Sequence, residues 1–510
     1  MARRHLVSVF FVVAMGGLMA WAFAGAAQRQ ASDDEQLFQQ YDRFIEILRI
    51  VQKQYVHEVD TKKMFSDAIR GMLAGLDPFS DYIPEEDMDE FNKMTRGKFG
   101  GIGIQIGMRR GMLVVISPLE DTPAFREGVL AGDVILEIEG KTTDGVTLNE
   151  AVKILTGDPG TRVTIKVRHL TGEFADITIT RAIIEVQTVK GLKRDADDRW
   201  VWMLDPEKKI GYIRVSSFVD STVAELRAAL EGLLADGMKS LVLDLRFNPG
   251  GQLRIALDMC DLFLDKGVIV QTRGRTSPHW EATATAEGSL PYFPLVVLIN
   301  PFSASASEIV AGALQDHNRA IIVGDRTFGK GSVQNVIPLE GEQAALKLTT
   351  SKYYLPNGRN IHREEDMTDA DEWGVIPDIL VPVKPEEYVG VVRARQEADI
   401  LHNGEPRKTE AGTVEPTETP APETPPAPPA PESPTKTPAL ESPPAPPAPE
   451  SPPAPGEEGF EEELDLEAPG AVPPAPEAPA AQPFTDRQLE RALDVLRSMG
   501  VIERYLKKAA

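Results

Sequence analysis

One stretch of the sequence, residues 300–334, carries the residue types and spacing that nucleophilic catalysis needs. Ser303, Ser305 and Ser307 alternate with alanines where an apolar run ends and a helical pattern begins. Small neighbours leave a serine open at such a turn, and the N–H groups of a helix start stabilise an oxyanion. Lys330 follows downstream between two glycines. A serine at a helix start and a lysine in a glycine-flanked turn can form a Ser-Lys dyad.

Both residues also have a structural alternative. Ser305 and Glu308 match a capping box, in which the serine only satisfies N–H groups at a helix start, and spacing alone favours capping. The run from Gly324 to Lys330 matches a phosphate-binding loop, but Gly331 stands where Ser or Thr is required. Because a strand pattern follows instead of a helix, the pattern argues against a nucleotide site.

Alternating strand and helix patterns around this stretch predict an α/β core domain over residues 186–385. Strand-like runs cover 210–218, 240–246, 295–299 and 320–323, and helical spacing covers 221–235 and 308–316. Within one strand, Asp244 and Arg246 are expected to pair inside the fold. The turn that follows holds Gly250 and Gly251, whose N–H groups could share an oxyanion hole with that of Ala306, a plain structural turn being the alternative.

The motifs SASASEI (303–309) and VGDRTFGKGSVQ (323–334) resemble those of the carboxyl-terminal processing proteases, also called tail-specific proteases. These are PDZ-containing serine peptidases, and the resemblance covers roughly residues 35–385. It implies a serine endopeptidase in which Ser305 is the nucleophile, Lys330 the general base and Gln334 the residue that orients the lysine. It implies no cofactor, and the seven histidines show no metal-ligand spacing.

To act as a general base, Lys330 must have a neutral amine. A lysine is a base only when neutral, whereas its ordinary pKa is about 10.4. Burial among apolar groups disfavours the ammonium and lowers this pKa. The amide of Gln334 would hold the amine without adding charge. We therefore expect a partly buried lysine.

Residues 98–185 resemble a PDZ domain in the order of their elements. A glycine-rich stretch at 99–104 precedes strand patterns at 112–116, 134–138 and 161–168 and a helical pattern at 148–155. In such domains a glycine loop offers N–H groups to the terminal carboxylate of a peptide that adds as an edge strand. The predicted peptide-binding residues are Gly101, Ile102, Gly103 and Ile104. The implied partners are proteins or peptides with apolar carboxyl termini, and a plain β-turn is the alternative.

The amino-terminal segment predicts export. Arg3 and Arg4 precede an apolar run from Leu6 to Ala27, so we expect residues 1–27 to be a signal peptide or a signal anchor in the inner membrane. The protein is then periplasmic, in the cell envelope. Residues 33–97 are predicted to be mostly helical, with a turn at LDPFSDY (76–82) that also resembles the family. The resemblance implies that this region helps to build a homodimer. An activating partner protein is a further expectation.

The composition excludes other classes. A net charge of −24 argues against nucleic acid as a partner. Cys260 is the only cysteine, so no intramolecular disulfide can form, and its apolar surroundings favour packing within a helix.

Composition changes sharply at residues 401–483. Of the 41 prolines in the chain, 24 lie between Pro416 and Pro483, and the decapeptide PPAPPAPESP occurs at 425–434 and again at 443–452. Proline and like charges oppose folding, so we expect a disordered spacer. A carboxyl-terminal helix is predicted at 484–508, and its docking cannot be read from the pattern.

A rival function is that of a binding protein whose PDZ domain captures tails while the protease fold is inactive. Ser305, Lys330 and Gln334 are all present, which argues against it.

Overall fold

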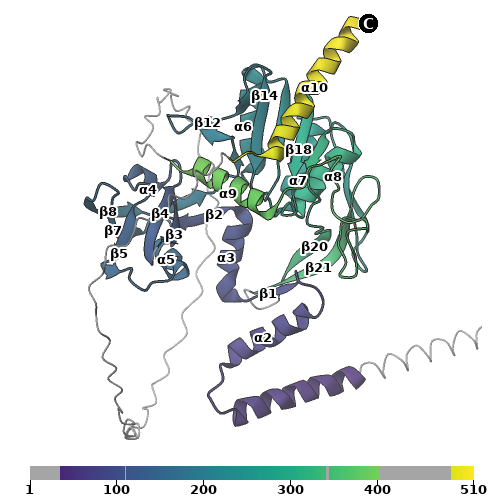
Figure 1. Cartoon of the computed structure of the whole chain (residues 1–510). Helices are drawn as coiled ribbons and strands as arrows, with labels where there is room; N and C mark the ends of the chain where they lie inside the picture. The colour runs from purple at the N-terminus through teal and green to yellow at the C-terminus, as the bar shows by residue number, and fades with distance from the viewer. Residues whose placement is uncertain (1–34, 110, 340–343, 402–483, 510) are drawn as a thin grey trace, which may run out of the picture. The chain divides into compact units, whose positions relative to one another are not determined.

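The computed structural model describes residues 35–109, 111–339, 344–401 and 484–509, with side chains up to residue 500 (Figure 1). The predicted signal segment lies outside these residues, as does the predicted spacer except for its first residue. No helix among the described residues is long and apolar enough to cross a membrane.

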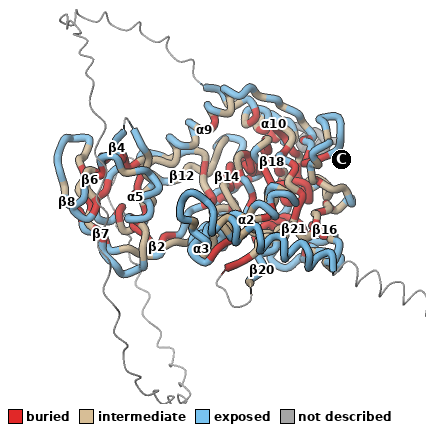
Figure 2. Tube along the Cα trace, turned by 90° about the horizontal axis from the view of Figure 1, so that it is seen from below, coloured by how far each residue is buried: buried red, intermediate tan, exposed pale blue. Residues whose placement is uncertain are grey.

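A mixed seven-stranded sheet forms the centre of the core, with β14, β15, β18, β19 and β22 parallel to one another. Its strands are β10 (Val189–Lys190), β13 (Met203–Asp205), β14 (Ile210–Val215), β15 (Ser240–Asp244), β18 (Leu295–Ile299), β19 (Ile321–Gly324) and β22 (Ile379–Leu380). All residues of β14, β15 and β18 are buried, as Figure 2 shows along the middle of the core. Continuous apolar runs are typical of parallel strands that are covered on both faces.

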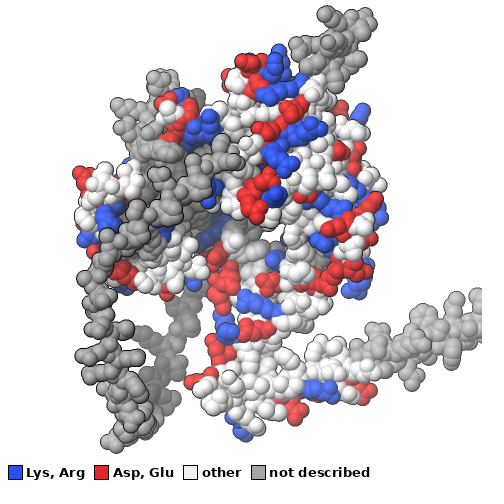
Figure 3. Space-filling model, in the orientation of Figure 1, with Lys and Arg blue, Asp and Glu red and all other residues white. Residues whose placement is uncertain are grey.

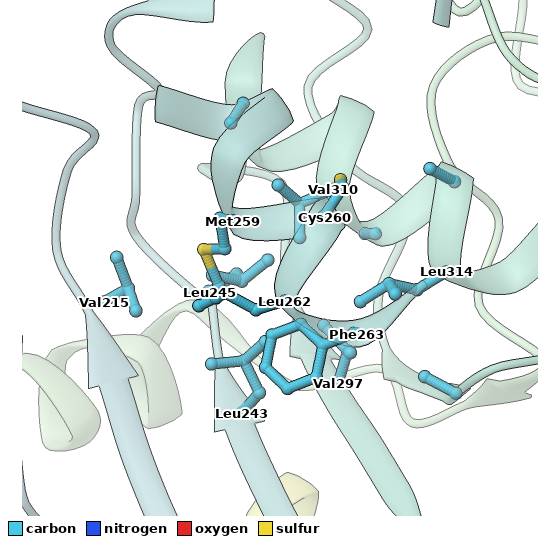
Figure 4. Packing of buried hydrophobic residues seen from close by; sticks show 14 of the residues in the cluster. Val215, Leu243, Leu245, Met259, Cys260, Leu262, Phe263, Val297, Val310 and Leu314 are labelled. Carbon is cyan, nitrogen blue, oxygen red and sulfur yellow. The ribbon is translucent and has the colours of Figure 1, made fainter. Parts of the chain in front are cut away.

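Helices cover the two faces of this sheet. On one face, α6 (Thr222–Ala235), α7 (Leu253–Phe263) and α8 (Ala306–Asp316) share a large apolar cluster with alternate residues of the strands (Figure 4). Cys260 is fully buried there, as predicted, and burial raises the pKa of its thiol. The other face carries α10 (Arg487–Ala509), which packs Ala492 and Leu496 against the remaining strand residues.

A second, antiparallel sheet of five strands lies in the same domain. It contains β1 (Asp81–Ile83), β16 (Gly267–Arg273), β17 (Trp280–Ala284), β20 (Ser332–Pro338) and β21 (Ala345–Tyr354). Here β1, from the amino-terminal region, pairs with β21, placing Asp81 opposite Lys347. The amino-terminal region therefore contributes a strand directly to the second sheet of the core.

The PDZ region is a six-stranded antiparallel sheet with its own apolar cluster. It contains β3 (Ile104–Arg109), β4 (Met112–Pro118), β5 (Val134–Ile138), β6 (Lys141–Thr142), β7 (Arg162–Arg168), β8 (Phe174–Thr180), α4 (Pro123–Arg126) and α5 (Leu148–Leu155). Two further sheets have only two antiparallel strands each. One pairs β2 (Lys98–Gly101) with β9 (Ala182–Glu185), and the other pairs β11 (Lys193–Arg194) with β12 (Trp200–Val201).

Several helices of the described chain lie outside the two faces of the central sheet and outside the PDZ region. They are an amino-terminal helix at residues 35–54, α2 (Thr61–Ala74), α3 (Glu85–Arg96) and α9 (Pro385–Asp399). The helix at 35–54 exposes a row of apolar side chains, including Leu37, Tyr41 and Phe44. The first turn of α3 is acidic, and it forms part of a red band in Figure 3.

Candidate active site

The structure separates the three serines of residues 303–307 by their surroundings. Ser303 and Ser307 are fully buried, and each hydroxyl donates 2.9 Å to a backbone carbonyl, that of Leu245 and that of Asn248 respectively. Ser305 alone is partly exposed, immediately before α8. Two of the three hydroxyls therefore hold the turn together, and Ser305 is the one serine of the three that is not fully buried.

Ser305 has an unusual backbone conformation, with φ 57° and ψ −114°. A residue with a side chain adopts such angles only where the surrounding structure imposes them, and such residues cluster at active sites. Two backbone hydrogen bonds hold this conformation in place. The N–H of Ala304 donates to the Asn248 carbonyl at 3.0 Å, and the N–H of Ser305 donates to the Glu308 carboxylate at 2.8 Å. The Glu308 contact is that expected of a capping box, so capping and an exposed nucleophile occur at the same residue.

The loop at 247–251 passes directly beside Ser305. A side-chain carbon on Gly250, whose φ is +104°, would lie 2.9 Å from Cβ of Ser305 and 3.0 Å from the nitrogen of Ala306. The Gly250 N–H donates to Oδ1 of Asn248 at 2.9 Å. Within the described chain the N–H groups of Gly251 and Ala306 have no hydrogen-bond partner. Of the two glycines considered from the sequence, Gly251 is therefore the one with a free donor.

Glu308 joins the serine turn to the lysine loop. This fully buried carboxylate accepts from the N–H of Ser305 and the N–H of Lys330, both at 2.8 Å, and from the N–H of Gly329 at 2.7 Å. Its fourth donor is the hydroxyl of Thr327, at 2.5 Å. Burial raises the pKa of Glu308, and four donors that favour the charged form oppose the effect of burial. The sequence indicated only a capping role for this residue.

Lys330 is half-buried, as its predicted role requires. Desolvation lowers the pKa of its amine, and the nearby Lys347 lowers it further, whereas Glu308 and Asp77 act in the opposite direction. Its Nζ lies over the ring of Phe79, 4.6 Å from the centroid. Among the described residues no hydrogen bond joins Nζ to Ser305 or to Gln334.

Gln334 lies on β20, in a polar network that the sequence did not indicate. Its amide donates to the hydroxyls of Ser332 at 2.8 Å and Thr349 at 3.2 Å. Thr349 in turn donates to Asp77 at 3.1 Å, and Asp77 also accepts from the N–H of Phe79 at 2.8 Å. The turn at residues 76–82 is thus fixed to the second sheet, and this places Phe79 against the lysine. The sequence signal for this contact was the motif LDPFSDY (76–82), which drew attention as a turn and not as part of the site.

The segment at 362–373 packs partly against the lysine loop, and the N–H of Arg363 donates to the Gly329 carbonyl at 2.9 Å. Trp373 is buried, and a side-chain carbon on Gly329 would lie 2.9 Å both from the Trp373 ring and from Cβ of Arg363. The loop before Lys330 therefore needs glycine at this position.

The predicted peptide-binding residues lie at an edge of the PDZ sheet. Among the described strands β3 has a neighbour on one side only, β4, and a groove of about 270 Å³ lies between β3 and α5. The groove is lined by Phe99, Ile102, Gly103, Ile104, Ile106, Leu148, Val152, Leu155 and Thr156. Gly101 ends β2 and pairs with Ala182, outside the lining. At Gly103, φ is +81° and a side-chain carbon would lie 2.2 Å from Cβ of Thr122, so this glycine is also required by the fold.

The described residues contain no cluster of histidine, cysteine, aspartate and glutamate side chains that could hold a metal ion.

Family models match three parts of the chain. Residues 209–381 match peptidase family S41, residues 100–180 match the PDZ domain, and residues 17–87 match the amino-terminal domain of the activating protease CtpB. Over 389 residues the chain is 42% identical to a carboxy-terminal-processing protease of Bartonella bacilliformis, covering 75% of this chain and 84% of that protein. It is 31% identical to the carboxy-terminal processing protease CtpA of Bacillus subtilis, covering 71% and 76% of the two chains.

A solved structure, the photosystem II D1 C-terminal processing protease, is 27% identical over 70% of this chain and 98% of its own, with a TM-score of 0.37. The sequence relatives and the two domain matches decide the assignment. The chain belongs to peptidase family S41, as a carboxy-terminal processing serine protease with a PDZ domain.

Proposed function

We propose that the protein is an exported endopeptidase that captures apolar carboxyl-terminal tails in its PDZ groove and cuts peptide bonds with a Ser305–Lys330 dyad. The observation that carries the proposal is the Glu308 carboxylate, which accepts from the backbone N–H groups of both residues at 2.8 Å. A buried carboxylate with these donors fixes the two peptide units relative to each other. The loops that carry the nucleophile and the base are therefore held together by Glu308 before substrate binds.

The reaction then proceeds in two steps of acyl transfer. Neutral Lys330 accepts the hydroxyl proton while Oγ of Ser305 attacks the scissile carbonyl, and the lysine ammonium returns that proton to the leaving amine. Water hydrolyses the acyl-enzyme with Lys330 again as base. In both steps the N–H groups of Gly251 and Ala306 stabilise the negative charge on the carbonyl oxygen.

The position of the lysine side chain adds a step before the chemistry. Nζ lies over Phe79, where the ring face favours its ammonium form. To act as base, the side chain turns from Phe79 toward Ser305, and Gln334 exchanges one hydroxyl partner for the amine. This rearrangement accompanies substrate binding in our proposal.

Tail capture follows from the shape of the groove. Its lining is apolar apart from backbone groups and Thr156, and the free edge of β3 can pair with an extended peptide. The backbone from Gly101 to Ile104 enters this edge, where it would meet the terminal carboxylate. Apolar tails with a free carboxylate are thus the proposed ligands.

Export and assembly belong to the same proposal. The apolar run from Leu6 to Ala27 supports a periplasmic enzyme, either released or held at the inner membrane. The exposed apolar row on the helix at 35–54 supports a homodimer, because such surface is costly to leave in water. An activating partner protein would act by favouring the arrangement in which Lys330 faces Ser305.

The test compares cleavage of one unfolded substrate, as free acid and as carboxyl-terminal amide, by the wild type and by Ser305→Ala. We expect no cleavage by Ser305→Ala and a strong preference of the wild type for the free acid. Equal rates for acid and amide would disprove carboxylate capture. Cleavage by Ser305→Ala would disprove the dyad.

A groove variant completes this test. Val152→Glu places a charge in the groove from a half-exposed helix position, so it should weaken cleavage of apolar tails without unfolding the domain. It is preferable to a substitution at Gly103, which would collide with Thr122.

A further inference from the structure

The first turn of α10 reaches the core beside the loop at 247–251, although residues 402–483 separate it from α9 in the sequence. Asp486 accepts two hydrogen bonds from the guanidinium of Arg246, both 2.8 Å long, and Gln488 accepts a third at 3.2 Å. Arg246 is 2% exposed, so its charge is satisfied by protein groups and not by water. Two parallel hydrogen bonds fix the plane of a guanidinium as well as its position.

Arg246 is shared between two carboxylates. On its other side it donates to Asp244, at 2.7 Å from Nη2, and Asp244 also accepts from Arg395 at 2.7 Å and from the Tyr212 hydroxyl at 2.8 Å. Two arginines and two aspartates balance in charge. Without Asp486 the cluster would keep two positive charges against one negative charge, in a site where water cannot compensate.

This cluster also holds the start of the loop that faces Ser305. Arg395 donates to the carbonyl of Arg246 at 2.7 Å. The next residue, Phe247, has φ +62°, which is costly for a residue with a side chain and persists only where neighbours impose it. Its N–H donates to Asn300 at 2.9 Å. From there the loop continues through Asn248 to the glycines beside the serine turn.

We propose that Asp486 is a positioning residue for catalysis: through Arg246 it fixes the loop at 247–251, which presents the Gly251 N–H to the reacting carbonyl. The helix α10 is then part of the catalytic apparatus and not only a cover for the sheet. The inference rests on the oxyanion hole of the proposed function, which it deepens by adding a residue from the far end of the chain.

A purely structural role of α10 makes a different prediction. The helix packs Leu489, Ala492, Leu493 and Leu496 against the sheet and presents charges of both signs outward (Figure 3). If Asp486 only helped this docking, its loss would lower the melting temperature, and folded enzyme would keep its kcat. If it positions the loop, kcat falls in folded enzyme while KM changes little, because the loop acts on the transition state.

The experiment measures kcat, KM and thermal melting of the full-length protein with substitutions at two of the ion pairs that join α10 to the core. Asp486→Asn removes the charge and keeps the shape. The matched control is Arg497→Ala, which breaks another ion pair of α10, with Asp205 at 2.8 Å, away from the loop. At a temperature where both variants are folded, we expect kcat to fall roughly tenfold or more in Asp486→Asn, with KM within about twofold, and to stay unchanged in Arg497→Ala.

Wild-type kcat in folded Asp486→Asn would overturn the proposal, as would an equal loss in Arg497→Ala. If Asp486→Asn shows no cooperative melting, Asp486→Glu replaces it, since it keeps the charge and moves the carboxylate by one methylene. A loss of about threefold or more in kcat is then expected, and wild-type kcat would refute the positioning role. Ser305→Ala is assayed in parallel, because activity in that variant would overturn the proposed function and not this inference.

Discussion

Ser305 and Lys330 differ in how much of each residue the fold holds in place. Around Ser305 the backbone is fixed on every side, by buried serines, by Glu308 and by the loop at 247–251. At Lys330 only the backbone is fixed, and the side chain lies over Phe79 without a hydrogen bond among the described residues. In the proposed mechanism, therefore, Ser305 is in place before substrate binds, and the side chain of Lys330 is the part that moves.

The largest expected effect is that of Ser305→Ala, which should reduce cleavage by roughly 10⁴-fold or more while the protein stays folded. Ser307→Ala is the matched control. It removes a buried hydrogen bond to the Asn248 carbonyl, so we expect about 1 kcal/mol of lost stability in denaturant unfolding, and substantial activity. If Ser307→Ala were inactive and Ser305→Ala active, the assignment of Ser305 as nucleophile and of Ser307 as a structural residue would be wrong.

Lys330→Ala should cost about 10³-fold in kcat/KM, because the proton acceptor is lost. In the proposed mechanism the neutral lysine is the active form. Since desolvation lowers its pKa, the rate should rise with pH and level off below the range expected for an exposed lysine. A pH–rate profile from about pH 6 to 10 measures this rise. A flat profile, or one that falls with pH, would argue against a lysine base.

Glu308→Gln should destabilise the protein by about 3 kcal/mol and lower kcat, because the new NH2 group faces N–H donors in a buried site. Urea unfolding measures the stability. The control is Glu150→Gln, in the exposed capping box with Thr147, where we expect a loss of under about 1 kcal/mol. Similar losses at the two positions would mean that Glu308 only caps a helix.

The smallest effect is expected from Gln334→Ala, a several-fold loss of kcat with about 1 kcal/mol of lost stability. Its informative readout is the pH–rate profile. If Gln334 exchanges its bond to Ser332 or Thr349 for one to the amine during the reaction, the midpoint of the profile shifts in the variant. An unchanged midpoint would mean that Gln334 only fastens β20 to β21.

Local sequence patterns determined those elements of this protein whose structure depends on interactions between residues close together in the chain. The helix predicted at 148–155 is α5 with the same bounds, and the strand predicted at 295–299 is β18. A cap, a period of 3.6 residues or a run of β-branched side chains acts within a few residues, so it can be read without the fold. The SASAS and FGKG motifs likewise gave the candidate residues of the site.

Tertiary structure alone decided how these pieces meet. It showed which serine is open, that Glu308 joins two loops, that Phe79 covers the lysine, and that Gly250 has already used its N–H. It also showed that α10 docks, through a hydrogen bond between Arg246 and Asp486, residues 240 positions apart. Such contacts follow from burial and charge balance across the whole fold, and no local periodicity encodes which distant residue will satisfy a buried charge.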